Sequence, residues 1–174
     1  MPELRKNILI FTGDGKGKST AAFGMALRAV GHQQRVLVLQ FMKQDDSIGE
    51  LAGLKQLGIE VIQTGCGFVP KPEHPDYASH QQSAQQGFVL ACEALASSKY
   101  DLVVFDEICG AVAKGLLEEA EVVDALLNAP AQNIVLTGRG ATEGLIALAD
   151  TVSEINCCKH ALANGVAARK GVEF

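Results

Sequence analysis

The sequence predicts an α/β fold, a doubly wound, mostly parallel sheet of five to six strands with helices on both faces. Short apolar runs alternate along the chain with stretches of helical periodicity, a pattern typical of this class. Most of the apolar runs are continuous rather than alternating, which suits strands buried on both faces of a parallel sheet. The 174 residues contain no repeat, low-complexity segment or linker, so we expect one domain, 1–174.

The loops that follow the expected strands are where we expect the chemistry. In doubly wound sheets the crossovers are right-handed, and ligands bind beyond the carboxyl ends of the strands. The long third helix has an apolar stripe at helical spacing in Phe88, Ala91 and Leu95. The expected strands are 7–12, 35–41, 60–64, 101–106, 133–137 and 151–155, and the expected helices are 19–30, 47–57, 77–97, 116–128 and 143–148.

Composition and charge exclude several classes of protein. Apolar residues make up 48% and charged residues 20%, close to the globular average and unlike a disordered chain or a coiled coil. The formal net charge of −5 argues against sequence-independent binding to duplex DNA, so we expect no nucleic-acid partner. No apolar run approaches the roughly 18 residues of a membrane helix, so we expect no membrane association either.

The cysteines indicate a reducing compartment. There are five, an odd number, and their scatter matches no zinc-ligand spacing. Cys157 and Cys158 are adjacent, which is neither a CxxC redox spacing nor an easy mutual disulfide. We interpret all five as small buried apolar side chains in a cytoplasmic protein.

The segment after the first strand has the features of a phosphate-binding loop. A strand leads into a Gly-rich turn that opens directly into a helix, the context that a P-loop requires. The glycines let successive backbone N–H groups converge on an anion, and the helix N-terminus adds partial positive charge. We expect Lys18 to contact phosphate oxygens and Ser19 to hold Mg²⁺. The loop comprises Thr12, Gly13, Asp14, Gly15, Lys16, Gly17, Lys18, Ser19 and Thr20.

This loop is one residue shorter than the standard pattern. A glycine, four residues and Gly-Lys-Ser would need a glycine where Thr12 stands, and the first glycine is Gly13. The loop also has a second cation, Lys16. The alternative interpretation is a Gly-rich turn with two solvated lysines. The shorter loop indicates that the phosphates lie differently from those in ordinary nucleoside triphosphatases.

Two further loops have polar groups suited to a nucleotide. The fourth strand ends in Asp106 and Glu107, the Walker-B arrangement that places hard oxygen ligands near a metal ion and phosphates. Either carboxylate could be the ligand. The fifth strand leads to Arg139 between two glycines, where its planar guanidinium could reach a phosphate, although an ordinary surface turn is an equal alternative.

Together these stretches resemble the P-loop ATP:corrinoid adenosyltransferases, of the cob(I)alamin or cob(I)yrinic acid a,c-diamide type. The resemblance covers nearly the whole chain, and the short loop combined with the C-terminal pattern is its most specific part. It implies a P-loop NTPase-like (RecA-like) three-layer sandwich. The matching stretches are 12–22, 28–32, 40–43, 49–50, 106–107, 137–141, 149–154, 159–161, 165–166, 168–169 and 171–174.

The resemblance implies an enzyme that transfers the 5′-deoxyadenosyl group of ATP to Co(I) of a reduced corrinoid and releases triphosphate, in cobalamin biosynthesis or salvage. Members of the family bind ATP in a reversed orientation, with the loop around the γ-phosphate and the ribose 5′-carbon open to attack. The nucleotide-binding residues so implied are Gly13, Asp14, Gly15, Lys16, Gly17, Lys18, Ser19, Thr20, Arg28 and Arg139.

The resemblance also assigns the metal, the catalytic residues and the partners. Mg²⁺ or Mn²⁺ would be held by Ser19 and Glu107, with Asp106 in support. Lys18, Glu107 and Phe68 would be the catalytic residues, and no general base is needed. The remaining partners implied are a reduced flavoprotein as electron donor and a second copy of the chain in a homodimer.

One segment departs from the family pattern. Members usually have Gly-Phe-Thr-Trp after the third strand, whereas this chain has Gly67, Phe68, Val69 and Pro70 and no tryptophan. Phe68 is the candidate apolar wedge that keeps a lower axial ligand off the corrinoid, and packing in the core is its alternative. We interpret the nearby His74 and His80 as solvated loop histidines rather than cobalt ligands.

Two other functions remain open from the sequence. A P-loop phosphotransferase such as a small nucleoside kinase would share the first loop and the two carboxylates, but it usually also has a lid of arginines. A non-catalytic carrier of ATP or corrinoid would fit the altered segment 67–75.

Overall fold

A single parallel sheet organises the molecule. The computed structural model describes residues 5–45, 48–130 and 132–172, and within these ranges six strands pair in the order β3-β2-β4-β5-β1-β6. Every neighbouring pair is parallel, so the predicted fold class is confirmed and the sheet is wholly rather than mostly parallel. The strands are β1 (Asn7–Thr12), β2 (Val36–Gln40), β3 (Glu60–Gln63), β4 (Leu102–Asp106), β5 (Asn133–Thr137) and β6 (Thr151–Glu154).

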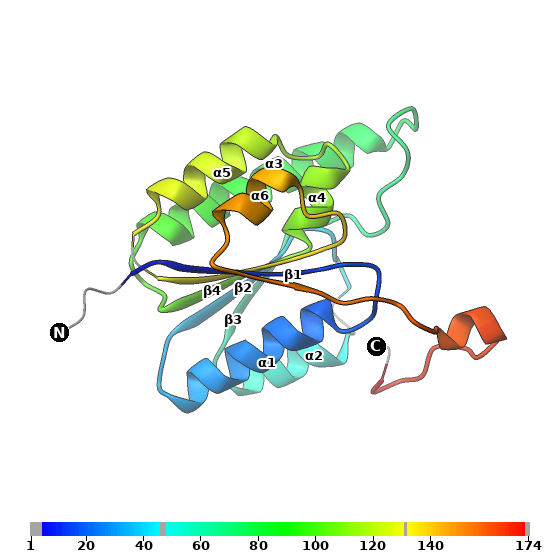
Figure 1. Ribbon diagram of the computed structural model, residues 1–174, viewed down its shortest axis with the longest axis horizontal. Coiled ribbons are helices and arrows are strands. Elements are labelled where there is room, and N and C mark those ends of the chain that lie inside the picture. Colours follow the sequence, from blue (N-terminus) through cyan, green and yellow to red (C-terminus); the bar gives the residue numbers. More distant parts are fainter. Residues whose placement is uncertain (1–4, 46–47, 131, 173–174) are drawn as a thin grey trace.

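Helices cover both faces of the sheet and complete three layers (Figure 1). One face has α1 (Lys18–Gly31) and α2 (Gly49–Gln56). The other has α3 (Tyr77–Ala96), α4 (Ile108–Ala113), α5 (Glu119–Asn128) and α6 (Glu143–Leu148). No helix in the described part of the chain is both long and apolar enough to cross a membrane.

Alternation along the strands divides the interior into two cores. In β2, Leu37 and Leu39 pack with the layer of α3 to α6, whereas Val36 and Val38 pack with the α1 layer. All four side chains are buried, because a parallel sheet between two helical layers has no solvent face. The predicted stripe of α3 is confirmed, since Ala91 and Leu95 are buried in the larger core.

The sheet order brings three predicted loops to one place. β4, β5 and β1 are neighbours, with Phe105 opposite Leu136 and Leu136 opposite Ile10. Parallel neighbours end at the same edge, so the loops after these strands meet there. This edge lies at the right in Figure 1, where the chain leaves β1 for α1.

Several helix boundaries differ from the sequence prediction. The helix expected over 116–128 begins at Glu119, and a short helix that was not expected, α4, follows β4 directly. Leu116 and Leu117 are buried but precede the helix, because Glu118 has extended backbone (φ −75°, ψ 126°) and is its N-cap. The expected start of the second helix, residue 47, lies outside the described residues.

Two side-chain interpretations are corrected. His80 is not a solvated loop residue, because it lies within α3 and is 9% exposed. The cysteines are free, but only Cys109 is buried; Cys66 and Cys92 are half-buried, and Cys157 and Cys158 are exposed. The exposed pair follows β6, where the chain has left the core.

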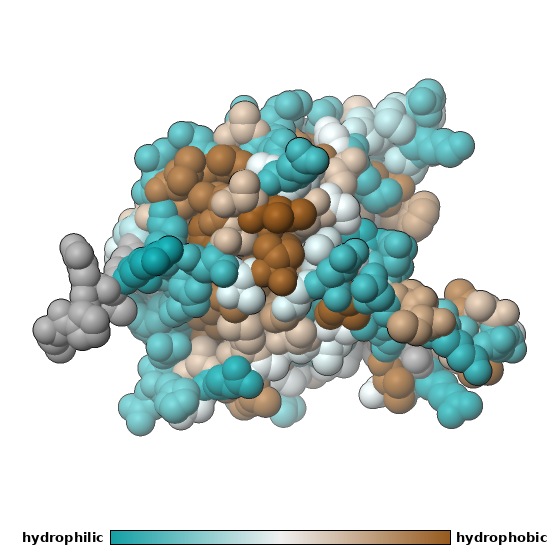
Figure 2. Space-filling model, viewed as in Figure 1, coloured by the Kyte–Doolittle hydropathy of each residue, from teal (hydrophilic) through white to brown (hydrophobic). Residues whose placement is uncertain are grey.

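The segment 156–172, which we call the arm, extends from β6 away from the layered body (Figure 1). It contains a short 3-10 helix, Ala161–Asn164, and its residues are exposed. Apolar and hydrophilic side chains alternate on it in the space-filling view, and a second apolar group lies over α5 and α6 (Figure 2). Leu162 and Val172 of the arm are among the exposed apolar residues.

Candidate active site

The β1–α1 loop leaves the first amides of α1 available to an anion. Gly17 is the N-cap, with a φ of +115°, and no side chain caps the helix. The first turn of α1 contains no acidic residue that would oppose a phosphate. Uncapped N–H groups and the helix dipole together favour negative charge at this point. Thr12 still belongs to β1 and pairs with Glu154, which is why the turn starts one residue later than in the standard pattern.

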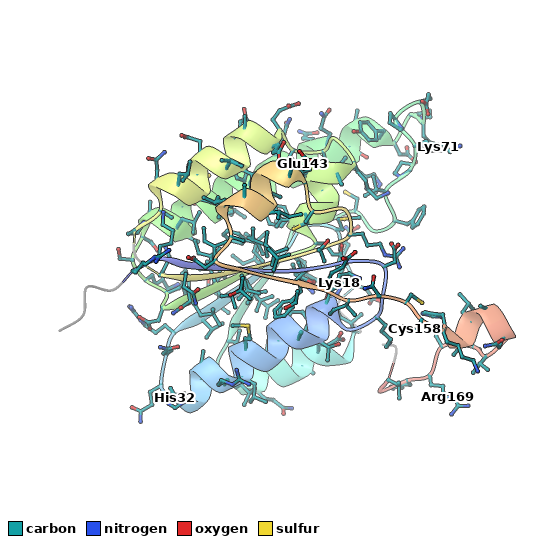
Figure 3. The ribbon with its side chains drawn as sticks, in the orientation of Figure 1. Lys18, His32, Lys71, Glu143, Cys158 and Arg169 are labelled. Carbon is teal, nitrogen blue, oxygen red and sulfur yellow. The ribbon has the colours of Figure 1, made fainter. Side chains whose placement is uncertain are left out.

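Lys18 lies over this loop. Its side chain is 7% exposed, and Nζ donates to the carbonyl oxygen of Gly15 at 2.6 Å. Burial lowers the pKa of Lys18, while the charges of Glu107 and Asp14 oppose that shift. Figure 3 shows Lys18 at the start of α1, facing the carboxyl edge of the sheet, with His32 at the opposite end of the helix. The ammonium group is thus held where a phosphate would meet the loop amides.

The loop is braced by the end of β6. The amide of Gly15 donates to the carbonyl oxygen of Ile155 at 2.7 Å, and the Ile155 amide donates to Thr12 at 2.9 Å. A Cβ on Gly13 would lie 2.5 Å from the Ile155 oxygen, and one on Gly15 would lie 2.7 Å from it. Close packing therefore requires glycine at both positions. Ile155, the residue before the arm, helps to hold the β1–α1 loop in place.

Asp106 is the buried polar centre of the edge. It is fully buried, and its carboxylate accepts from Gln40 Nε2 at 2.9 Å and from Thr137 Oγ1 at 2.8 Å. Lys43 Nζ lies 3.2 Å from the same carboxylate. A buried carboxylate with two hydrogen bonds and a cation is well satisfied by the protein itself. Asp106 therefore joins the ends of β2, β4 and β5.

Glu107, the next residue, differs from Asp106 in how its carboxylate is paired. Within the described ranges its carboxylate has no hydrogen bond and no ion pair, although the side chain is only partly exposed. Burial raises the pKa of Glu107, as does the neighbouring charge of Asp106, while Lys43, Lys18 and Arg139 act against these effects. Its backbone has a φ of +66°, an uncommon conformation for a residue with a side chain. The backbone N–H donates to Thr137 Oγ1 at 2.9 Å, which holds the residue in this turn.

The β5–α6 loop contacts both of the other loops. Gly138 has a φ of +137°, and a Cβ there would lie 2.5 Å from the backbone nitrogen of Gly110 in α4. Arg139 Nη2 is 3.5 Å from the carbonyl oxygen of Asp14 in the phosphate loop. The guanidinium therefore lies beside the β1–α1 loop.

Two predicted residues lie apart from this cluster. Arg28 is exposed in the last turn of α1, ten residues beyond Lys18, or about 15 Å along the helix axis. There it complements the negative end of the helix dipole. Phe68 is 94% exposed after β3, so the core-packing alternative is wrong. Its roles as wedge and catalytic residue stay predictions, as does nucleotide binding by Arg28.

The comparisons with known proteins identify the family. The family model described as "ATP:corrinoid adenosyltransferase BtuR/CobO/CobP" matches residues 5–174. The chain belongs to the ATP:corrinoid adenosyltransferase family. This confirms the family resemblance, the corrinoid adenosyltransferase function and the transferase class.

Curated relatives agree with this membership. A "Corrinoid adenosyltransferase" of Escherichia coli (strain K12) is 42% identical over 170 residues, covering 96% of this chain and 85% of the relative. One from Pseudomonas aeruginosa is 41% identical over 168 residues, covering 96% and 83%. "Corrinoid adenosyltransferase CobA" of Salmonella typhimurium is 41% identical over 175 residues, covering 99% and 87%.

A solved structure supports the fold independently. The flagellar accessory protein FlaH from Methanocaldococcus jannaschii superposes with a TM-score of 0.56 at 14% identity, covering 86% of this chain and 70% of that one. At this identity the likeness concerns the three-layer α/β architecture alone.

Sequence reasoning missed three contributors to the adenosyltransferase site. Gln40 and Thr137 end strands and hold Asp106, and Ile155 braces the phosphate loop. A polar residue that ends an apolar strand is a usable signal, and Gln40 and Thr137 both provide it. Ile155 provides none, because it acts through its backbone.

Because the carboxylate of Asp106 is paired and that of Glu107 is not, substitution of the two residues should change the free energy of unfolding differently. Asp106→Ala should lower the free energy of unfolding by about 3–5 kcal/mol, since it removes the buried acceptor of two hydrogen bonds and the partner of the Lys43 charge. Glu107→Gly should leave it unchanged or raise it by up to about 1 kcal/mol, because glycine accepts the positive φ without strain. Chemical denaturation of both variants measures this. Equal losses would contradict the division of roles, and Glu107→Ala, which keeps the strained backbone, is the matched control.

Proposed function

We propose that this chain catalyses attack by Co(I) of a reduced corrinoid on the ribose 5′-carbon of ATP, with the triphosphate held by the β1–α1 loop. The observation that carries the proposal is the arrangement of uncapped α1 amides and buried Lys18 beside a carboxylate, Glu107, that the protein leaves unpaired among its described residues. Family membership favours this reaction over the phosphotransferase and the carrier that the sequence left open.

The reaction is a displacement at carbon. The Co(I) electron pair forms the bond to C5′, the bond between C5′ and the α-phosphate oxygen breaks, and its electron pair stays on that oxygen. Inorganic triphosphate leaves with the extra negative charge. Co(I) has no proton to lose, so no general base is required. The task of the protein is to orient ATP and to stabilise the charge that develops on the leaving group.

The phosphate loop suits this task. Lys18 and the first amides of α1 are fixed before the substrate arrives, so little reorganisation is needed when charge develops. Lys16 and Arg139 add cationic charge at the loop, and Asp14, Ser19 and Thr20 complete the proposed nucleotide-binding set. Arg28, at the far end of α1, stays a proposed member of this set without a contact that supports it.

A divalent cation fits the oxygen groups of the site. Mg²⁺ or Mn²⁺ needs only one or two protein oxygens when phosphates supply further ligands. The described ranges contain no group of three or more His, Cys, Asp or Glu side chains that could hold a metal ion. The half-buried Ser19 hydroxyl and the unpaired Glu107 carboxylate would hold it, with Asp106 in support. When bound, the cation would neutralise charge on the triphosphate.

Phe68 is the candidate contact for the corrinoid. A phenyl ring that is 94% exposed has little packing to lose and can lie against an apolar ligand face. We propose that it excludes the lower axial ligand and so makes Co(II) easier to reduce to Co(I). His74, exposed in the same loop, is not required by this scheme.

The remaining parts of the proposal concern the cellular setting. We propose a cytoplasmic enzyme of cobalamin biosynthesis or salvage, working as one domain over 1–174 and as a homodimer. The electron that converts Co(II) to Co(I) would come from a reduced flavoprotein, as the family resemblance implies.

The direct test is product analysis. The protein is incubated with ATP, Mg²⁺ and chemically reduced cobalamin, while the absorbance change of cobalt–carbon bond formation is followed and triphosphate is assayed. Triphosphate and alkylcobalamin in equal amounts are expected. ADP in place of triphosphate would support a kinase, and corrinoid binding without turnover would support a carrier.

Removal of the Lys18 charge should weaken nucleotide binding. Lys18→Ala is expected to raise the dissociation constant of ATP about 10- to 100-fold, since a charge-assisted hydrogen bond contributes roughly 1.5–3 kcal/mol. Titration calorimetry measures the change, with the exposed Lys55→Ala as matched control. Near-normal ATP affinity in Lys18→Ala would contradict the assignment.

Removal of the Phe68 ring should affect reduction more than transfer. Phe68→Ala is expected to slow adenosylation that starts from Co(II) far more than adenosylation that starts from prepared Co(I). Its free energy of unfolding should change by less than about 0.5 kcal/mol, as is usual for an exposed side chain. Parallel rate assays with the two oxidation states provide the measurement. Equal losses in both assays would count against the wedge role.

A further inference from the structure

Lys43 contacts Asp106 and has no role in the proposed reaction described above. It follows β2, and its Nζ lies 3.2 Å from Asp106 Oδ2. The same atom lies 5.8 Å from the centroid of the Phe23 ring of α1. The side chain is 31% exposed, so the ammonium group faces Asp106 and α1 on one side and the open edge on the other. Its charge also acts on Glu107.

The backbone of Lys43 contacts a different part of the molecule. Its carbonyl oxygen accepts from the amide of Gly65 at 3.2 Å, and the Met42 carbonyl accepts from Gly67 at 3.0 Å. A Cβ on Gly65 would overlap the backbone of Met42 and Lys43. The loops after β2 and β3 therefore lie in direct backbone contact, with no side chain between them.

Phe68 lies next to this backbone contact in the sequence. It directly follows Gly67, whose φ is +91°, and it precedes Val69, which is 3% exposed in the core. The ring thus projects from a short stretch that is hydrogen-bonded to residues 42 and 43 on one side and anchored in the core on the other. Gly65 and Gly67 therefore join the backbone of residues 42 and 43 to the stretch that carries Phe68.

We propose that Lys43 is a positioning residue that couples nucleotide binding to the placement of Phe68. Its ammonium group pairs with Asp106 and acts on Glu107, so a triphosphate and cation that bind at Glu107 change the balance of charge on it. Its carbonyl group transmits the resulting shift to the segment that holds the ring. The inference rests on the proposed function, because it needs ATP at the β1–α1 loop.

The sequence offers a clean probe, because the chain has no tryptophan. Phe68→Trp introduces a single indole at the tip of the loop. Its fluorescence emission is expected to shift when Mg²⁺ and ATP are added in saturating amounts. In the double variant Phe68→Trp with Lys43→Met, most of this shift should be lost at ATP concentrations that calorimetry shows to be saturating.

Matched variants separate coupling from structural damage. Lys43→Arg should restore the shift, because it keeps the cation beside Asp106, and Lys55→Met should leave it unchanged. Gly65→Ala keeps the Lys43 charge but forces the two loops apart, so it should abolish the shift while ATP affinity stays near that of Phe68→Trp.

The outcomes distinguish the two claims. A shift that persists in either Lys43→Met or Gly65→Ala, or ATP binding to Phe68→Trp with no shift at all, would overturn the coupling and leave the proposed function intact. Absence of ATP binding to the wild-type chain would overturn the proposed function, and the coupling with it.

Discussion

A buried carboxylate must be neutralised within the fold, and at Asp106 this requirement organises the whole carboxyl edge of the sheet. Gln40 from β2 and Thr137 from β5 donate to it, and Lys43 supplies the opposite charge. Each partner comes from a strand adjacent to β4 or from the loop that follows one. Loss of the pairing would leave a charge in the interior at a cost of several kcal/mol. The site can therefore form only when the strands are in this order and register.

The same arrangement gives two adjacent carboxylates different environments. Asp106 is satisfied by the protein, whereas Glu107 is held in a left-handed turn with its carboxylate unpaired among the described residues. Such strain and desolvation reduce stability locally and are typical of a functional position. The sequence left open which of the two would serve as metal ligand. The contacts favour Glu107, with Asp106 as its support.

Sequence reasoning predicted the fold class and the family correctly, because both depend on local pattern. Continuous apolar strands indicate a parallel sheet, and Gly13 to Ser19 has a recognisable spacing after a strand. Gln40 ends an apolar strand, which makes it a candidate from sequence, but its hydrogen bond to Asp106 depends on β2 and β4 being neighbours. The short helix α4 was missed because Glu107 adopts a positive φ and starts it. The exposure of Cys157 and Cys158 could not be anticipated, because it depends on where the chain leaves the body after β6.

The central claim is that the short β1–α1 loop holds the end of the triphosphate and leaves the ribose toward the open edge. A crystal structure with Mg²⁺ and a non-hydrolysable ATP analogue tests this most directly. The γ-phosphate is expected against Lys18 and the first amides of α1, with the ribose 5′-carbon facing the side of Phe68. A buried ribose, with the γ-phosphate directed toward the open edge, would contradict it and indicate ordinary phosphoryl transfer.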